Sequence, residues 1–252
     1  YYDVADSELI CEQIKAAADD PSVKAVVLNL NTPGGEVTAS DEIYNEVMNL
    51  RKEGKKVVAS MSSMAASGGY YIAAGADRII ANKHTLTGSI GVIMSTYNYT
   101  ELFSKIGLKS EVFKSGQMKD MLNGGRPRTE VEVSVVQNLI DSTYSEFVNI
   151  VAKGRGIPAE TVKGTIIGDG RVFDGKQALA LKLIDKIGYL DDSIEDAAKL
   201  AGLQKHSYSV VRYEEAFSFA RLFSQVKSGI PSKSMNISIQ GNPGRFQPQC
   251  GK

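Results

Sequence analysis

The stretch VKAVVLNLNTPGG, residues 23–35, decides the fold. Its residues 23–30 are almost continuously apolar and rich in valine, which is typical of a strand buried on both faces of a sheet. Residues 31–35 break this pattern, and apolar residues then recur at helical spacing at Ile43, Val47 and Leu50. A strand, a glycine turn and a helix in this order predict a parallel α/β core with right-handed crossovers.

The same alternation continues along the chain. Further strands are expected at residues 56–60, 78–81, 91–97 and 109–113. Further helices are expected at residues 7–19, 67–74, 174–185, 190–201 and 215–227. Thr129 and Glu132 form a capping box ahead of another helix, which should run to about Lys153. The chain is rich in Gly, Pro, Ser, Asn and Gln after residue 228, so we expect one domain over residues 1–228 and a loose tail over residues 229–252.

Composition narrows the class of protein. The 29 Lys and Arg residues balance 29 Asp and Glu residues, and neither half carries a basic block, which argues against a nucleic-acid or anionic-membrane binder. The apolar runs are far shorter than the roughly 20 residues that a spanning helix needs. The chain begins at Tyr1 with no initiator Met or signal-like segment, which is typical of an excised fragment. Cys11 and Cys250 predict neither a metal site nor a disulfide framework, and Cys11 is expected to be a small buried residue.

Three glycine-marked turns could carry chemistry. The turn at 31–36 is either a simple tight turn or a backbone N–H donor for an oxyanion. In the second turn Ser67 follows a strand and opens a helix among small residues, which is the layout of a nucleophile elbow without the G-x-S-x-G spelling, and equally that of a helix N-cap. The third turn, residues 113–120, contains lysines, which are mostly solvated surface charges.

A serine nucleophile needs a base, and the sequence limits the choice. The two histidines, His84 and His206, lie in polar surroundings without an obvious carboxylate to orient them. A Ser-His-Asp triad is therefore poorly supported, and a lysine base is the other known route.

Taken together, the motifs resemble the signal peptide peptidase A family of Ser-Lys proteases, in the clan that also holds ClpP and the crotonases. The resemblance runs from about Val23 to Leu190, and the match looks close to the short Gram-positive-type members. It rests on six segments in order: NTPGG at 31–35, MAASGGYY at 64–71, TGSIGV at 87–92, GQMKD at 116–120, GRVF at 170–173 and ALALKLID at 178–185.

The resemblance implies a role for particular residues. Ser67 matches the nucleophile and Lys119 the general base, with Ser89 holding the lysine amine. Gly34 and Gly68 match the oxyanion donors, and Gly35 is the alternative to Gly34.

The resemblance also implies the fold and the biology. The fold would be α/β, with a ClpP/crotonase-like core of repeated β-β-α and βαβ units and a helical C-terminal half. The family degrades cleaved signal peptides and other short or unfolded chains at the cell membrane, on the extracytoplasmic side, without a metal or nucleotide. The active protein would be a ring, an octamer, with sites shared between subunits and an anchor outside this chain.

Two relatives in the clan differ in chemistry. ClpP carries its histidine base about 25 residues after the serine, where this chain has Val92. The crotonases need an acid–base carboxylate and an acyl-CoA site, which no feature here supports. Three function classes therefore remain: an independent serine peptidase, a ClpP-like component that needs an ATPase partner, and an inactive scaffold.

The lysine mechanism places a demand on its surroundings. A lysine with its ordinary pKa of about 10.4 is only about 0.04% neutral at pH 7. Burial of the amine favours the neutral form, whereas a nearby carboxylate favours the charged form. We therefore expect the Asp120 side chain to point away from Lys119.

Overall fold

The computed structural model describes residues 6–205, 207–213 and 236–241. The chain divides into two compact units. The larger unit comprises Tyr1–Ile90 with Val148–Lys252, and the smaller unit comprises Gly91–Phe147. The smaller unit lies within the single domain predicted over residues 1–228, and the larger unit extends beyond residue 228. The domain boundary at residue 228 stays a prediction.

The larger unit contains an eight-stranded sheet among its described residues. Its parallel strands are β1 (Val23–Thr32), β2 (Lys56–Ala66), β3 (Arg78–Ala81), β4 (Leu86–Gly88) and β6 (Lys186–Ile187). Three further strands pair antiparallel: β5 (Val172–Phe173) with β4, β8 (Asn236–Gly241) with β1, and β7 (Ser209–Tyr213) with β8. The parallel α/β core predicted from residues 23–35 is confirmed.

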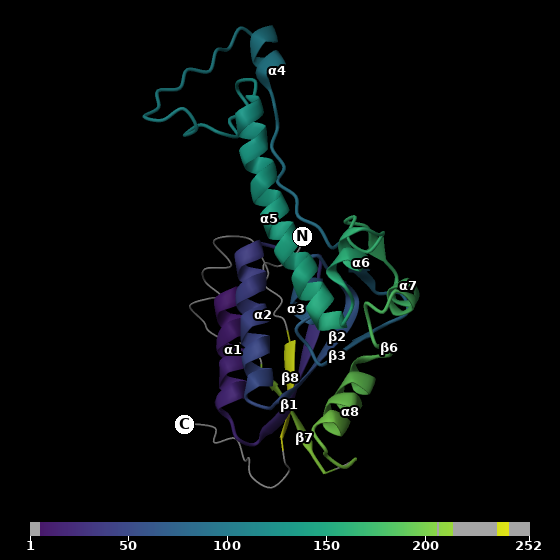
Figure 1. The fold of residues 1–252 in the computed structure, drawn as a ribbon. Helices are drawn as coiled ribbons and strands as arrows, with labels where there is room; N and C mark the ends of the chain where they lie inside the picture. The colour runs from purple at the N-terminus through teal and green to yellow at the C-terminus, as the bar shows by residue number, and fades with distance from the viewer. Residues whose placement is uncertain (1–5, 206, 214–235, 242–252) are drawn as a thin grey trace, which may run out of the picture. The chain divides into compact units, whose positions relative to one another are not determined.

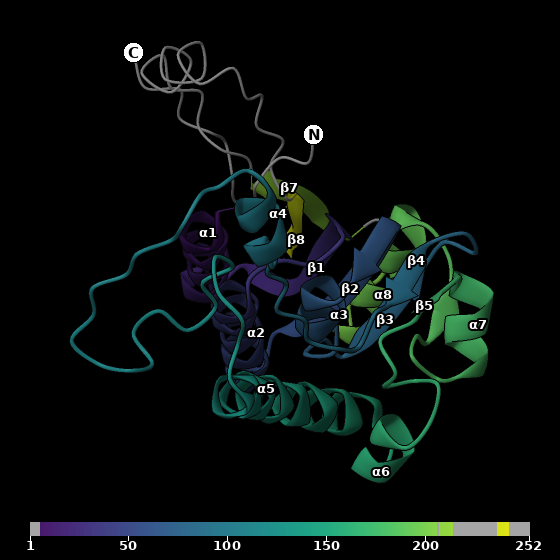
Figure 2. The same cartoon turned by 90° about the horizontal axis from the view of Figure 1, so that it is seen from above.

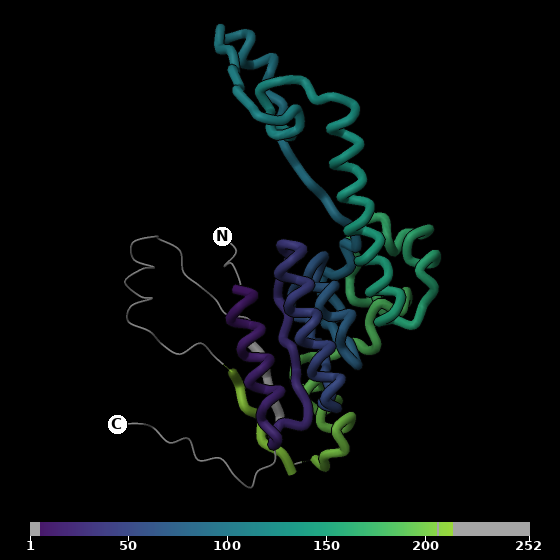
Figure 3. Tube along the Cα trace, turned by 60° about the vertical axis from the view of Figure 1, so that its left-hand side comes forward, coloured from purple at the N-terminus to yellow at the C-terminus, as the bar shows by residue number. Residues whose placement is uncertain are grey.

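Helices cover both faces of this sheet (Figure 1). Helices α1 (Ser7–Asp19) and α2 (Val37–Lys52) lie side by side on one face (Figure 3). On the other face, α8 (Leu190–Leu200) places Ala197 against Ala25 and Val27 of β1. Successive side chains of a strand point to opposite faces, so β1 must be apolar at nearly every position to serve both layers.

The remaining helices of the larger unit are short. They are α3 (Gly68–Ala73), α6 (Ala159–Lys163) and α7 (Gly175–Ala180), which lies beside β4 and β5 (Figure 2). Helix α7 is shorter than the helix predicted over 174–185, because the chain enters β6 at Lys186 through a turn that contains Lys182 at a φ of 61°. The helix predicted at 215–227 lies outside the described residues.

Strand β2 is longer than its apolar pattern indicated. It was expected to end at Ser60 and instead continues to Ala66, pairing with β3 through its first half and with β4 through its second half. Side-chain bonds to the end of β1 support the extension, because Ser62 Oγ donates to Asn29 Oδ1 at 3.0 Å. The extension brings the MAAS segment beside the turn that follows β1, with Thr32 paired to Ala65.

The smaller unit contains α4 (Thr100–Lys105) and the start of α5 (Glu130–Arg155), which continues into the larger unit. The capping box before α5 is confirmed, since Glu132 N donates to Thr129 Oγ1 at 3.2 Å and Thr129 N to Glu132 Oε2 at 2.8 Å. The helix ends two residues later than expected, ahead of Gly156 at a φ of 62°.

The strands predicted at 91–97 and 109–113 are wrong. Neither range forms a strand, and each has a large apolar side chain in solvent: Ile93 is 88% exposed and Phe113 is 96% exposed. A segment with an alternating apolar pattern forms a strand only where a neighbouring strand pairs with its backbone. The smaller unit, all of which the structure describes, contains no strand that could pair with either range.

Two expectations concern the ends of the chain. Residues 229–252 were assigned to a loose tail, but residues 236–241 form β8 in the sheet, and the rest of that range lies outside the described residues. Cys11 is a buried free thiol, as expected, and burial raises its pKa. No helix in the described part of the chain is both long enough and apolar enough to cross a bilayer.

Candidate active site

Two turns of the larger unit meet at the carboxyl ends of β1 and β2. The first turn holds Gly34 at a φ of 108°, which favours glycine. A Cβ atom on Gly34 would lie 2.7 Å from Ser67 Cβ and 2.8 Å from Gly68 N. Only a residue without a side chain can therefore bring the NTPGG turn into contact with Ser67.

Ser67 occupies a strained backbone conformation between β2 and α3. Its φ is 52° and its ψ is −121°, a region that costs a serine on the order of 1–3 kcal/mol. The backbone is held on both sides: Ser67 N donates to Gly88 O at 2.8 Å, and Ser67 O accepts from Tyr70 N and Tyr71 N, each at 2.9 Å. Such a strained strand-to-helix turn, which exposes the serine hydroxyl, is the geometry of a nucleophile elbow.

The competing interpretation of Ser67 was a helix N-cap. Ser67 does stand at the N-cap position of α3, but its hydroxyl makes no capping hydrogen bond. The hydroxyl has no other hydrogen-bond partner within the described residues either. It is half-buried and available for chemistry.

The structure separates the three candidate oxyanion donors. Gly34 N donates to Thr32 Oγ1 at 3.2 Å, so this N–H is turned back toward its own strand. Gly35 N and Gly68 N have no acceptor in the described part of the chain. These two groups are also close together, because a Cβ atom on Gly68 would lie 3.2 Å from Gly35 N. The geometry therefore favours Gly35 over Gly34 as the partner of Gly68.

Ser89 lies one residue beyond the carbonyl that holds Ser67. It has a φ of 50°, and its N–H donates to Arg171 O at 2.8 Å. The hydrogen bond from Ser67 N to Gly88 O therefore links the turn that contains Ser67 to the turn that contains Ser89. Like Ser67, Ser89 is half-buried and its hydroxyl has no partner among the residues described.

Sequence reasoning missed the residues that support the elbow. Tyr70 is fully buried and donates from its hydroxyl to Leu183 O at 2.7 Å, which ties α3 to the ALALKLID segment, and burial raises the pKa of this phenol. Thr87 Oγ1 donates to Ala65 O at 2.7 Å and so holds β4 against β2 just before Ser67. Tyr70 lies in the MAASGGYY segment and Thr87 in the TGSIGV segment, and this position in the two motifs is the signal by which the sequence could have indicated them.

Lys119 belongs to the smaller unit. It lies in a run of turns, where Lys119 N donates to Gly116 O at 3.1 Å, and its side chain is exposed. The ammonium has no hydrogen bond or ion pair with any described residue. The burial that a lysine base needs is thus not supplied by the smaller unit itself.

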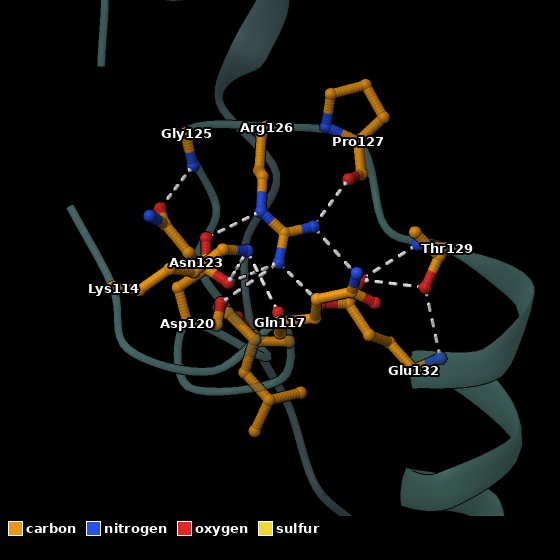
Figure 4. A network of polar contacts seen from close by, with 11 residues as sticks. Lys114, Gln117, Asp120, Asn123, Gly125, Arg126, Pro127, Thr129 and Glu132 are labelled. Carbon is orange, nitrogen blue, oxygen red and sulfur yellow. Dashed lines mark hydrogen bonds and ion pairs between the residues drawn. The ribbon is translucent and has the colours of Figure 1, made fainter. Parts of the chain in front are cut away.

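Asp120 points away from Lys119, as expected. Its carboxylate accepts from Lys114 Nζ at 2.6 Å and from Arg126 Nε and Nη2, each at 2.7 Å (Figure 4). The bonds from Arg126, and then those from Lys114, hold the pKa of Asp120 well below its usual range. The carboxylate nearest in sequence to the candidate base is therefore fully engaged elsewhere.

The histidine alternatives gain no support. His84 is exposed, and its one described hydrogen bond is from its backbone N–H to Asn82 Oδ1 at 2.9 Å. His206 lies outside the described residues. Within the described part of the chain, no group of His, Cys, Asp and Glu side chains could hold a metal ion.

Two family models match this chain. The model of peptidase family S49 covers residues 49–204, which include Ser67, Ser89 and Lys119. The model of Clp protease covers residues 2–95, the part with β1 to β4. The expected ClpP/crotonase-like α/β fold is thereby confirmed.

Individual relatives agree with these models. A protein named signal peptide peptidase SppA from Enterococcus faecium is 42% identical over 187 residues, which are 74% of this chain and 54% of the relative. A protease of Synechocystis sp. is 39% identical over 88% of this chain and 79% of its own length. The chloroplastic serine protease SPPA of Arabidopsis thaliana is 34% identical over 78% of this chain and 29% of its own. The chain thus spans about half the length of its enterococcal relative.

Proposed function

Since the chain belongs to peptidase family S49, we propose that it is a serine endopeptidase with Ser67 as nucleophile and Lys119 as general base. The observation that carries the proposal is the strained Ser67 turn: within the described residues its hydroxyl has no hydrogen-bond partner, and the nearby N–H groups of Gly35 and Gly68 have no acceptor. A helix cap has extended backbone and a capping hydrogen bond, whereas Ser67 has a positive φ and makes no such bond.

The proposed reaction follows from these positions. The neutral amine of Lys119 takes the proton from Ser67 Oγ, and Oγ attacks the carbonyl carbon of the scissile peptide bond. Gly35 N–H and Gly68 N–H donate to the oxygen, which becomes negative in the tetrahedral intermediate. The Lys119 ammonium returns its proton to the leaving amine, an acyl-enzyme remains on Ser67, and water activated by the same amine releases the acyl group.

A shared active site accounts for the exposure of Lys119. Exclusion of water from the amine favours its neutral form, but in the smaller unit Lys119 is exposed, as are the apolar side chains of Met118 and Phe113. We infer that another subunit covers this region, in a homo-oligomeric ring with eight copies. In the assembled site Ser89 Oγ would accept a hydrogen bond from the Lys119 amine. Analytical ultracentrifugation that finds an active monomer at assay concentration would contradict this arrangement.

The substrate class comes from the relatives. The enterococcal relative carries the name signal peptide peptidase, and we propose that this chain likewise degrades cleaved signal peptides and other short or unfolded polypeptides. Its place would be the extracytoplasmic face of the cell membrane. The test of this preference is to incubate the chain with a synthetic signal peptide and, separately, with a folded protein. We expect the peptide to be hydrolysed and the folded protein to stay intact.

A ClpP-like role with an ATPase partner is the second candidate, because the Clp protease model matches residues 2–95. The two roles differ in what the isolated chain can do. An independent peptidase cleaves an unfolded protein without ATP, whereas a ClpP-like component is limited to very short peptides until its partner is added.

Active-site labelling tests the dyad directly. A fluorophosphonate should label the wild type and the control Lys109→Ala, which changes another exposed lysine of the smaller unit, but not Ser67→Ala or Lys119→Ala. Lys119→Arg should be inactive at every accessible pH, because a guanidinium stays protonated. Near-normal turnover by Lys119→Arg would withdraw Lys119 as the base, and labelling of Ser67→Ala would withdraw Ser67.

A further inference from the structure

Arg126 is the hub of a charged cluster in the smaller unit (Figure 4). On one side its Nε and Nη2 each donate to the Asp120 carboxylate at 2.7 Å. On the other side its Nη1 donates to Glu132 Oε2 at 3.0 Å and its Nη2 donates to Glu132 Oε1. Nη1 also donates to Pro127 O at 3.0 Å, so every guanidinium nitrogen is used.

The two carboxylates of this cluster are withdrawn from water although the segment around them is exposed. The Asp120 side chain is 8% exposed and that of Glu132 is 3% exposed. The charged groups bonded to Asp120 are Arg126 and Lys114, and Lys114 Nζ also donates to Gln117 O at 2.9 Å. Two cations and two anions therefore balance within the cluster, and Lys119 is not part of it.

The cluster connects two pieces of the molecule. Asp120 follows Lys119 directly, whereas Glu132 belongs to the first turn of α5 and to its capping box with Thr129. A planar guanidinium can bind both carboxylates at once, which a lysine ammonium in the same place could not do with the same geometry. Arg126 thus fixes the turn that carries Lys119 to the start of a long helix.

We propose that Arg126 is a positioning residue for the lysine base, which keeps the Asp120 carboxylate away from the Lys119 amine and holds their turn against α5. The proposal rests on the proposed function of Lys119. A carboxylate within about 4–6 Å of an amine favours its protonated form. If Arg126 were lost, Asp120 could turn toward the adjacent Lys119, and the neutral amine would form only at higher pH.

The test is a set of four variants: Arg126→Gln, Asp120→Asn, the double variant with both changes, and Glu132→Gln. In the wild type kcat/KM rises with pH as the amine becomes neutral. Arg126→Gln should move this acid limb up by about one pH unit, a tenfold loss on the limb. Asp120→Asn alone should leave the limb in place, and adding it to Arg126→Gln should bring the limb back.

Glu132→Gln distinguishes an effect of Arg126 on the charge near Lys119 from a purely structural role of Arg126. It weakens the tie to α5 but leaves Arg126 on Asp120, so the acid limb should stay in place. If Arg126 only supports the fold, Arg126→Gln will lower kcat/KM equally at all pH values, Asp120→Asn will not restore it, and the proposal is overturned. An equal shift of the limb by Glu132→Gln would overturn it as well.

Titration of the Lys119 amine by NMR tests the role of Arg126 even if the proposed peptidase function is wrong. The ¹³Cε resonance of Lys119, assigned by its loss in Lys119→Arg, reports protonation of this amine without any turnover. Arg126→Gln should move its midpoint to higher pH and the double variant should return it, whether or not Lys119 is the base. An unchanged midpoint in a folded Arg126→Gln protein refutes the proposal.

Discussion

Replacing Gly34 by alanine should damage both stability and the Ser67 turn. Alanine at a φ of 108° is strained by about 1–3 kcal/mol. Its Cβ would also lie within 2.9 Å of Ser67 Cβ, Gly68 N and Ala66 O, and two of these are backbone atoms that cannot rotate away. Overpacking of this kind costs roughly another 1–3 kcal/mol. The expected loss is therefore about 2–6 kcal/mol, against a typical stability of about 5–15 kcal/mol.

Gly54 supplies a matched control. It also has a positive φ, 85°, but a Cβ atom there would meet nothing within 4 Å. Gly54→Ala should therefore show the backbone strain alone, and the difference between the two variants isolates the close approach to Ser67.

Urea unfolding and fluorophosphonate labelling measure the two effects. Gly34→Ala should lower the unfolding midpoint more than Gly54→Ala does, and labelling should slow by about a hundredfold if Ser67 moves by about 1 Å. Gly54→Ala should label at the wild-type rate. Equal midpoints for the two variants, together with normal labelling of Gly34→Ala, would refute the argument that glycine is needed there for contact with Ser67.

Three further predictions concern single groups. Tyr70→Phe should cost about 1–3 kcal/mol in urea unfolding because it leaves the buried carbonyl of Leu183 without its donor, and an unchanged midpoint would show that this bond is dispensable. The hydrogen bonds from Arg126 lower the pKa of Glu132 to about 2. Since the unfolded value is about 4.3, its stabilisation is present above that pH and is lost as the pH falls toward 2. The midpoints of wild type and Glu132→Gln should therefore converge between pH 5 and pH 2, and a constant gap would contradict this. His84→Gln should leave kcat within about tenfold, or about 1.4 kcal/mol, and a loss of several orders of magnitude in a folded variant would restore a histidine base.

Local patterns predicted a good part of this fold because their causes are local. Helix α1 has the predicted bounds, and the capping box at Thr129 and Glu132 is formed as expected. Strand β1 was evident because a strand buried on both faces must be apolar throughout. Turn residues such as the paired glycines after β1 follow from backbone sterics, which depend on the residue alone.

Other features depended on partners distant in sequence. Residues 91–97 and 109–113 have strand-like composition but no neighbouring strand, whereas residues 236–241 read as a tail and pair with β1. The extension of β2 to Ala66 rests in the same way on β4. A ladder of backbone hydrogen bonds joins two segments, and the pattern of one segment does not say whether the other is present.

The candidate site shows the same division. The sequence alone determined which residue types stand in each turn: Ser67 among small residues, paired glycines after β1, and Lys119 in a polar turn followed by Asp120. Only the tertiary structure decided how these groups are used. Thr32 turns the Gly34 N–H away and leaves that of Gly35 open, Gly88 holds Ser67 in its strained turn, and Arg126 draws Asp120 away from the lysine. The direction of an N–H or a carboxylate is set by the hydrogen-bond partner that the fold brings to it, and most of these partners come from other elements of the chain.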